Sequence, residues 1–148
     1  MRLGYNYRLD DIRAALGIGQ LEKLDEILAL RSSVAERYDE LLAGIDGVEV
    51  PCADDGDHRR SWFVYVVALP DTDARERVIA HFEREGIGFN RYLPSIHLQP
   101  YMRERYGFRE GMCPVSEAAS ARTLALPFFT GLEQSAQERV AEALAAAL

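Results

Sequence analysis

The stretch Ser61-Trp-Phe-Val-Tyr-Val-Val-Ala-Leu69 carries the clearest strand signal in the chain. Aromatic and β-branched side chains dominate it, and Pro70 closes it, as is typical of strands. Its residues are apolar at odd and even positions alike, so both faces of the strand are expected to be covered. The stretch therefore predicts a central strand with other elements packed over it.

Helical and extended patterns surround this strand on both sides. Apolar residues recur every three, four or seven positions from Leu9 to Leu42, which is typical of a helix. The elements predicted in chain order are a helix over 9–44, strands over 48–50 and 61–69, a helix from 71 or 72 to 86, a strand over 87–92, a helical turn over 101–106, a helix over 114–124, an extended stretch over 125–129 and a helix over 133–148. This order predicts an α+β fold, with a small, mainly antiparallel sheet packed by helices and preceded by a long N-terminal helix.

The length of the chain, 148 residues, favours a single domain. Within it we expect residues 1–44 to form a binding segment plus a long connecting helix, and residues 45–148 to form the α+β small domain. A continuous helix over 9–44 would be about 50 Å long, so something outside the core is expected to pack on its first half. Gly17 and Gly19 weaken this helix, and a bend near them is the alternative.

Composition and charge exclude several classes of protein. The net charge of −7 argues against nucleic-acid binding, which requires clustered Lys and Arg. No apolar run approaches the ~20 residues of a membrane span, and the first residues do not resemble a signal peptide. Cys52 and Cys113 are too few for a disulfide framework and lack metal-ligand spacing. These features predict a cytoplasmic protein without a bound metal.

Two segments carry candidate binding residues. In the first, Asn6 and Arg8 stand just before the long helix, where an asparagine amide and a guanidinium would face an anion-friendly helix N-terminus. In the second, Tyr92, His97 and Gln99, together with Tyr101, offer hydrogen-bonding groups on an aromatic background. A polar loop packed on the sheet is the alternative for the second segment. Neither segment completes a catalytic constellation by itself.

Several motifs, in this order along the chain, resemble those of the DegT/DnrJ/StrS family of pyridoxal-phosphate (PLP) sugar aminotransferases. The resemblance covers nearly the whole chain, and the first and third of the motifs make it specific. The motifs are Gly4-Tyr-Asn-Tyr-Arg-Leu-Asp-Asp-Ile-Arg-Ala-Ala-Leu-Gly17 with Gln20-Leu-Glu-Lys-Leu24, Ser61-Trp-Phe-Val-Tyr-Val66, Tyr92-Leu-Pro-Ser-Ile-His-Leu-Gln-Pro100, Cys113-Pro-Val-Ser-Glu117 and Leu124-Ala-Leu-Pro-Phe128.

The resemblance implies the fold-type I aminotransferase architecture, of which this chain matches the C-terminal small domain and its connecting helix. It implies that Asn6 reaches the PLP phosphate of the other subunit of a homodimer, and that Arg8 lies near the cofactor and substrate. It also implies that Tyr92, His97 and Gln99 lie near a sugar-nucleotide pocket.

The same resemblance places the Schiff-base lysine in an N-terminal large domain that these residues do not match. The only lysine of the chain is Lys23, which lies off the apolar stripe of the predicted helix, beside Glu22. A lysine on a solvated helix face is a poor Schiff-base former. The chain alone is therefore predicted to be inactive.

Two hypotheses of different classes follow. In the first, the chain is the C-terminal domain of a PLP-dependent aminotransferase that acts on keto-sugar nucleotides, and its partners are the large domain and a second copy. In the second, it is a stand-alone, non-catalytic module that binds a sugar nucleotide or dimerises through its first helix. Exposed apolar surface would favour self-association in both cases.

Overall fold

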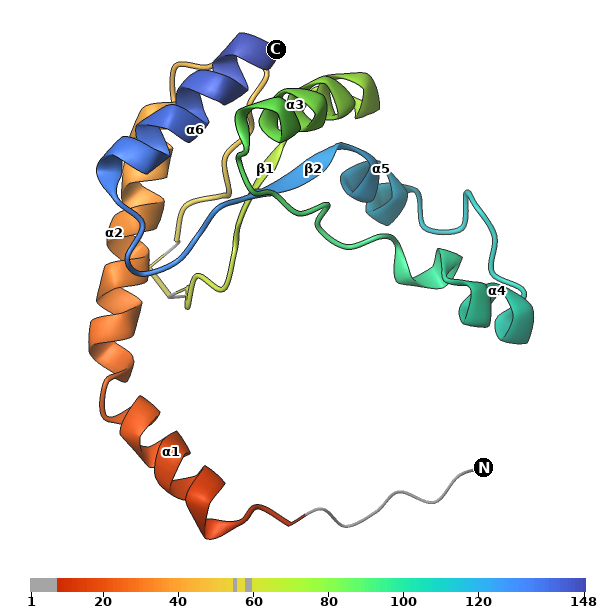
Figure 1. The fold of residues 1–148 in the computed structure, drawn as a ribbon. Coiled ribbons are helices and arrows are strands. Elements are labelled where there is room, and N and C mark those ends of the chain that lie inside the picture. Colours follow the sequence, from red (N-terminus) through yellow and green to blue (C-terminus); the bar gives the residue numbers. More distant parts are fainter. Residues whose placement is uncertain (1–7, 55, 58–59) are drawn as a thin grey trace.

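The computed structural model describes residues 8–54, 56–57 and 60–148 (Figure 1). The elements are α1 (Asp11–Leu21), α2 (Leu24–Leu42), β1 (Tyr65–Ala68), α3 (Thr72–Glu85), the 3₁₀ turn η1 (Ile96–Leu98), α4 (Pro100–Tyr106), α5 (Pro114–Arg122), β2 (Thr123–Leu126) and α6 (Gln134–Ala147). In Figure 1, α1 and α2 lie along the left side, α6 and α3 lie at the top, α5 and α4 lie to the right, and a small sheet lies at the centre.

The sheet consists of two antiparallel strands, β1 and β2, in the register Tyr65 opposite Leu126. Single bridges extend it on both sides, since Glu49 pairs with Ala68 and Asn90 pairs with Ala125. The predicted strands over 48–50 and 87–92 are thus reduced to one bridge each among the described residues. The α+β class and the small antiparallel sheet are confirmed.

The hydrophobic core lies between this sheet and helices α2, α3 and α6. Tyr65 and Val67 of β1 are fully buried, whereas Val66 and Ala68 are half-buried. One face of the strand is therefore fully covered and the other only partly, whereas its composition predicted that both faces would be covered. Tyr38 of α2 stacks close to Tyr65, with ring centroids 5.0 Å apart, and its hydroxyl donates to the carbonyl oxygen of Pro127 at 3.0 Å.

The predicted single helix over 9–44 is wrong, because the chain breaks into α1 and α2 at Glu22 and Lys23. Lys23 leaves the helical region, with φ −101° and ψ 5°, and its N–H donates to the carbonyl of Gln20 at 3.2 Å. This tightened last turn follows directly after the weak glycine-containing turn of α1. The bend therefore lies at Lys23, four residues beyond Gly19, rather than at the glycines.

The helix predicted from Asp71 or Thr72 to Gly86 is confirmed at both ends. The Asp71 carboxylate accepts the N–H of Ala74 at 2.7 Å, and Gly86 closes the helix in the left-handed conformation with φ 65°. Both signals are local, so the sequence alone specifies them. The helix predicted over 114–124 ends at Arg122, because its last residues join β2 instead.

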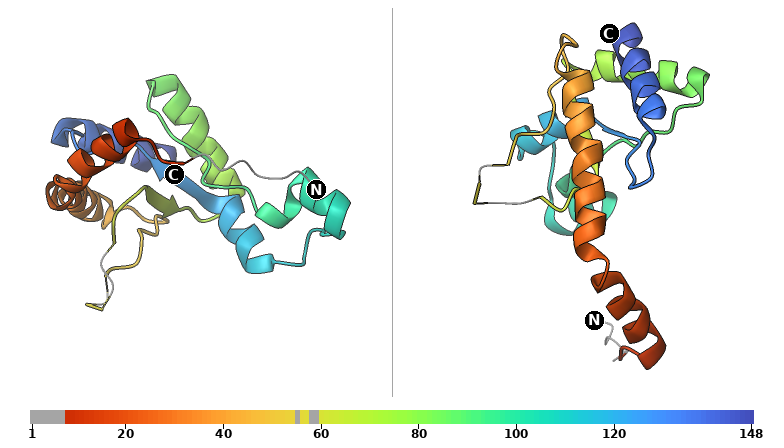
Figure 2. Two further views of the ribbon diagram at one scale, coloured as in Figure 1. Left: turned by 90° about the horizontal axis from the view of Figure 1, so that it is seen from below. Right: turned by 90° about the vertical axis from the view of Figure 1, so that its left-hand side faces the viewer.

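Helix α1 is an arm that projects from the rest of the molecule (Figure 2, right). None of its residues is buried, and the exposed fractions of Ile12 and Ile18 are 76% and 58%. A Cβ added at Gly17 or Gly19 would meet no atom within 4 Å, so nothing described packs closely there. The apolar stripe of α1 has no partner among the described residues.

Within the described part of the chain, no helix combines the length and the hydropathy required to cross a membrane.

Candidate functional site

The residues from Asn90 to Gln99 form an irregular segment that leaves the sheet and runs to η1. Its start is fixed by the paired backbone bonds of Asn90 with Ala125, at 3.1 and 2.8 Å. Leu93 then adopts φ +40°, an unfavourable conformation for a bulky side chain. This turn directs the segment away from the sheet and toward α5. Strained backbone of this kind is common near binding sites.

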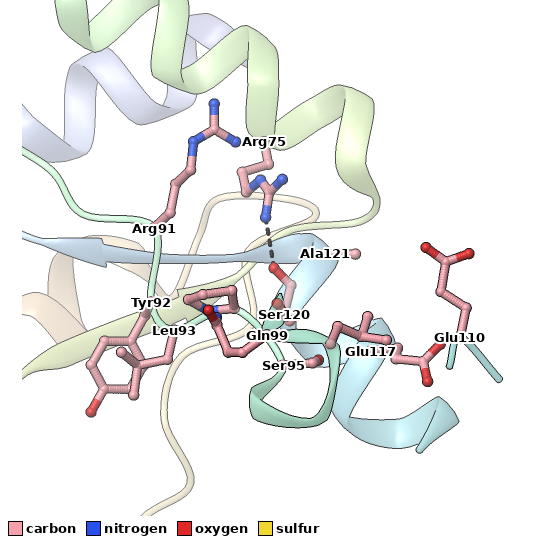
Figure 3. A pocket seen from close by; sticks show the side chains of 12 residues that line it. Arg75, Arg91, Tyr92, Leu93, Ser95, Gln99, Glu110, Glu117, Ser120 and Ala121 are labelled. Carbon is pink, nitrogen blue, oxygen red and sulfur yellow. Dashed lines mark hydrogen bonds between the residues drawn. The ribbon is translucent and has the colours of Figure 1, made fainter. Parts of the chain in front are cut away.

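A cavity of about 500 Å³ lies between this segment, the first turn of α3 and helix α5. Its volume falls within the ~300–1,000 Å³ of small-molecule sites. Apolar side chains form part of its wall, and the remainder is polar or charged (Figure 3). The lining residues are Arg75, Arg91, Tyr92, Leu93, Pro94, Ser95, Leu98, Gln99, Glu110, Glu117, Ser120 and Ala121.

Two arginines line one end of the cavity, and the carboxylate of Glu76, outside the lining, binds both of them. Arg91 binds Glu76 through both terminal nitrogens, one of them at 2.6 Å from Oε2. Arg75 is buried and donates to Glu76 at 3.0 Å and to the carbonyl of Ser120 at 2.7 Å, the bond dashed in Figure 3. The hydrogen bonds from Arg91, followed by those from Arg75, lower the pKa of Glu76 to about 2. Glu76 is thus an anion that joins α3 to the segment.

A second carboxylate, Glu117 on the first turn of α5, organises the other end. It accepts the backbone N–H of Gly111 at 3.0 Å and of Cys113 at 3.1 Å. Its Oε1 also lies 2.9 Å from Nε2 of His97. The backbone bond from Gly111 is the largest cause that lowers the pKa of this carboxyl, and the bond from Cys113 follows.

The structure brings two of the predicted binding residues to this cavity and leaves the others elsewhere. Tyr92 and Gln99 line it, although the Tyr92 phenol points away from the two arginines in Figure 3. His97 is only 8% exposed and lies behind the wall, against Glu117. Arg8 is exposed near the start of α1 and does not line the cavity. Asn6 lies outside the described residues.

Sequence reasoning missed the charged residues of the site. Arg91 directly precedes the motif that begins at Tyr92, and Glu117 is the last residue of the motif over 113–117. Their proximity to these motifs was the available sequence signal. Arg75 carries no such signal, because it reaches the cavity only through the packing of α3 against α5. Tyr101, expected beside the binding residues, is exposed on α4 and is not part of the lining.

The described residues do not by themselves fit PLP. A Schiff base needs a lysine, and the only lysine of the chain, Lys23, is exposed at the junction of α1 and α2. In Figure 1 this junction lies on the left of the molecule, away from α5, which contributes three residues to the cavity lining. No group of His, Cys, Asp and Glu side chains within the described ranges is arranged to hold a metal ion.

Comparison with known proteins identifies the family of this chain. The model of the DegT/DnrJ/EryC1/StrS aminotransferase family matches residues 1–145. The chain therefore belongs to this family. Aminotransferases of this family are PLP-dependent. The fold also matches the PLP form of Spr1654 from Streptococcus pneumoniae, at 22% identity and a TM-score of 0.86 over 95% of this chain and 36% of Spr1654.

Individual relatives agree with the family assignment. The spore coat polysaccharide biosynthesis protein SpsC of Bacillus subtilis is 30% identical over 145 residues, which are 95% of this chain and 37% of SpsC. The aminotransferase TlmJ of Streptoalloteichus hindustanus is 29% identical with a TM-score of 0.83, and 94% of this chain covers 36% of TlmJ. An aminotransferase of the same family from Brucella abortus is 32% identical with a TM-score of 0.79, at 97% and 37% coverage. The chain thus spans about a third of the length of these relatives.

Proposed function

We propose that residues 1–148 act as the small-domain part of a PLP-dependent aminotransferase that aminates a keto sugar carried on a nucleotide. The observation that supports this most directly is the family match over residues 1–145, which includes the segment from Tyr92 to Pro100. The name of SpsC, a spore coat polysaccharide biosynthesis protein, supports a sugar as the acceptor. Glutamate or glutamine is the proposed amino donor.

The proposal assigns the chain a supporting role in this chemistry. PLP would supply the electron sink for amino transfer, and it requires a lysine in a large-domain counterpart. Asn6 is proposed to contact the cofactor phosphate, while Arg8, Tyr92, His97 and Gln99 serve the substrate side. Of these, Tyr92 and Gln99 already share one cavity. Alone, residues 1–148 are expected to be inactive.

A direct test uses the chain with PLP, glutamate and a keto-sugar nucleotide. We expect no amino sugar, and no PLP adduct on Lys23 by mass spectrometry after borohydride reduction. Turnover that disappears in a Lys23→Ala variant would overturn the proposal. Addition of a separately produced large domain from a relative should restore turnover to the mixture.

The exposed apolar stripe of α1 has the character of a surface that a partner covers. Ile12, Leu16 and Leu21 are all strongly exposed on α1, which has no buried residue, and Leu9 just before the helix is exposed as well. Large contiguous apolar surface is uncommon on monomers. We propose that the large domain, or a second copy of the chain, covers this stripe.

A stand-alone binding module is the second candidate function. The cavity favours this candidate, because all of its lining residues belong to the described part of this chain. Trp62, the only tryptophan of the chain, provides a fluorescence probe for titration with a nucleotide sugar. A saturable change without added large domain would support this candidate. No change at millimolar ligand would leave assembly as the role of the isolated chain.

A further inference from the structure

The two carboxylates that line the cavity have different surroundings. Glu117 accepts two backbone N–H groups and faces the ring of His97. Glu110 lines the same cavity but makes no hydrogen bond or ion pair with the other residues that the structure describes. The bonds of Glu117 join segments that are far apart in the sequence, whereas Glu110 joins none.

These bonds connect η1 to the beginning of α5. His97 is the central residue of η1, and its Nε2 lies 2.9 Å from Glu117. A second link runs in parallel, because the hydroxyls of Ser95 and Ser116 are 3.3 Å apart. His97 also packs edge-on against Phe108, with ring centroids 6.4 Å apart. The histidine is thus enclosed by neighbours that hold its ring in one orientation.

The other end of the segment is held by a different carboxylate. Arg91 binds Glu76 on α3 through two nitrogens, so residues 92–96 lie between two charge-assisted attachments. Tyr92 lies just inside the first attachment, and Gln99 follows two residues after the second. Both line the cavity that the attachments border.

We infer that Glu117 is a positioning residue, which acts through His97 to fix the path of residues 92–99 and hence the places of Tyr92 and Gln99 in the cavity. His97 donates its Nε2 proton to this carboxylate and does not offer it to the substrate. The inference rests on the proposed function, because the places of Tyr92 and Gln99 matter for function only if residues 92–99 bind the substrate.

The first test compares Glu117→Gln with Glu110→Gln, which removes a charge from the same cavity without removing a described bond. Backbone amide spectra of the full chain are recorded for both variants and for the wild type. In Glu117→Gln we expect the resonances of Gly111 and Cys113 to shift, together with those of residues 92–99. In Glu110→Gln, residues 92–99 should keep their positions. Changes confined to residues 109–117 in Glu117→Gln would overturn the inference.

The nitrogen resonances of the His97 ring provide a second test. If Glu117 only held Gly111 and Cys113 in place, its substitution would leave these resonances unchanged. Long-range proton–nitrogen spectra should show Nε2 protonated in the wild type, because a carboxylate accepts only. In Glu117→Gln the ring nitrogen pattern should change, since the amide offers both a donor and an acceptor. An unchanged ring spectrum would contradict the coupling. Should Glu117→Gln not fold, His97→Gln spares the Gly111 and Cys113 bonds and should shift residues 92–99 alone.

A ligand titration separates this inference from the proposed function. We expect dTDP-glucose to shift the Tyr92 and Gln99 amides of the wild type, and its Kd to rise about tenfold in Glu117→Gln. Glu104→Gln, which removes an exposed charge on α4 outside the cavity lining, should bind within about twofold of the wild type. Equal affinities for the wild type and Glu117→Gln would overturn the inference. No binding by the wild type would contradict the proposed role of the segment, and the spectra above would still decide the link between Glu117 and residues 92–99.

Discussion

Helices α1 and α2 follow one another in the chain and share one apolar periodicity, but they differ in what that periodicity achieves. α2 buries Val34, Ala35, Tyr38 and Leu42 against the core. α1 buries nothing, although its stripe is at least as apolar. An apolar stripe therefore predicts which face of a helix will be covered, but not which part of a protein covers it.

This difference divides the chain energetically. Most helical stability in proteins comes from packing of an apolar face and not from intrinsic propensity. We therefore expect the stability of the chain to reside in α2, α3, α6 and the sheet, with α1 contributing little until its stripe is covered. Replacing a large apolar side chain by alanine in each of the two regions tests this division.

The largest effect is expected from Phe82→Ala in α3. Phe82 is fully buried and its ring packs against Phe89, with centroids 6.4 Å apart. The loss of buried area and the resulting cavity should lower the free energy of unfolding by about 3–5 kcal/mol. Chemical denaturation followed by circular dichroism measures this change.

The matched control is Leu16→Ala in α1, where the side chain is exposed. The free energy of unfolding should change by less than about 0.5 kcal/mol. A loss of several kcal/mol in this variant would show that α1 is already packed in solution, and the division between the two regions would fail.

Sequence predicted those parts of the fold whose signals are local. α3 was predicted correctly because Asp71 and Gly86 mark its ends within the helix itself. The break at Lys23 was not predicted, because the continuity of a helix depends on packing, and α1 lacks such packing among the described residues. The strands over 48–50 and 87–92 became single bridges because strand length depends on a partner elsewhere in the chain.

The next effect concerns a buried polar contact between α2 and α6. Gln137 is fully buried, donates to the carbonyl of Val34 at 2.9 Å and accepts from Arg37 at 2.7 Å. Gln137→Leu would leave the Arg37 guanidinium without this acceptor, so the free energy of unfolding should fall by about 1–3 kcal/mol. Gln134→Leu, which removes an exposed bond to Glu138 on the same helix, should change it by less than about 0.5 kcal/mol. Equal losses in the two variants would contradict a special role for the buried contact.

A smaller, pH-dependent effect is expected from Glu76. Its pKa is lowered in the folded chain from 4.5 to about 2, chiefly by hydrogen bonds from Arg91. The stability it contributes is therefore complete above the unfolded value and is lost as the pH falls from about 4.5 toward 2. Because the carboxylate is partly exposed, Glu76→Gln should cost no more than about 1 kcal/mol at pH 7 and should flatten the acid limb of the stability curve. Glu110→Gln is the control, and an identical acid limb in wild type and Glu76→Gln would contradict the assignment.

The site was predictable only where its residues are neighbours in the sequence. Tyr92 and Gln99 were chosen from one short segment, and the structure places both in the cavity. Arg75 and Glu117 approach that segment from α3 and α5. Glu117 ends a quoted motif, but no pattern in the sequence links either residue to the segment. Contact between His97 and a substrate stays a prediction. In the inference above, the Nε2 proton of His97 is donated to Glu117 and not to a substrate.

The smallest effect on folding, and the sharpest test of the arm, is expected from Ile12→Gln combined with Leu16→Gln. Both side chains are exposed, so the free energy of unfolding should change by less than about 0.5 kcal/mol. Self-association should nevertheless fall, because the substitutions remove apolar surface that is otherwise covered only by a partner. Sedimentation velocity of the wild type and the double variant over a range of concentrations measures this. A strictly monomeric wild type would show that the stripe does not drive self-association, and the large-domain counterpart would then be its only proposed partner.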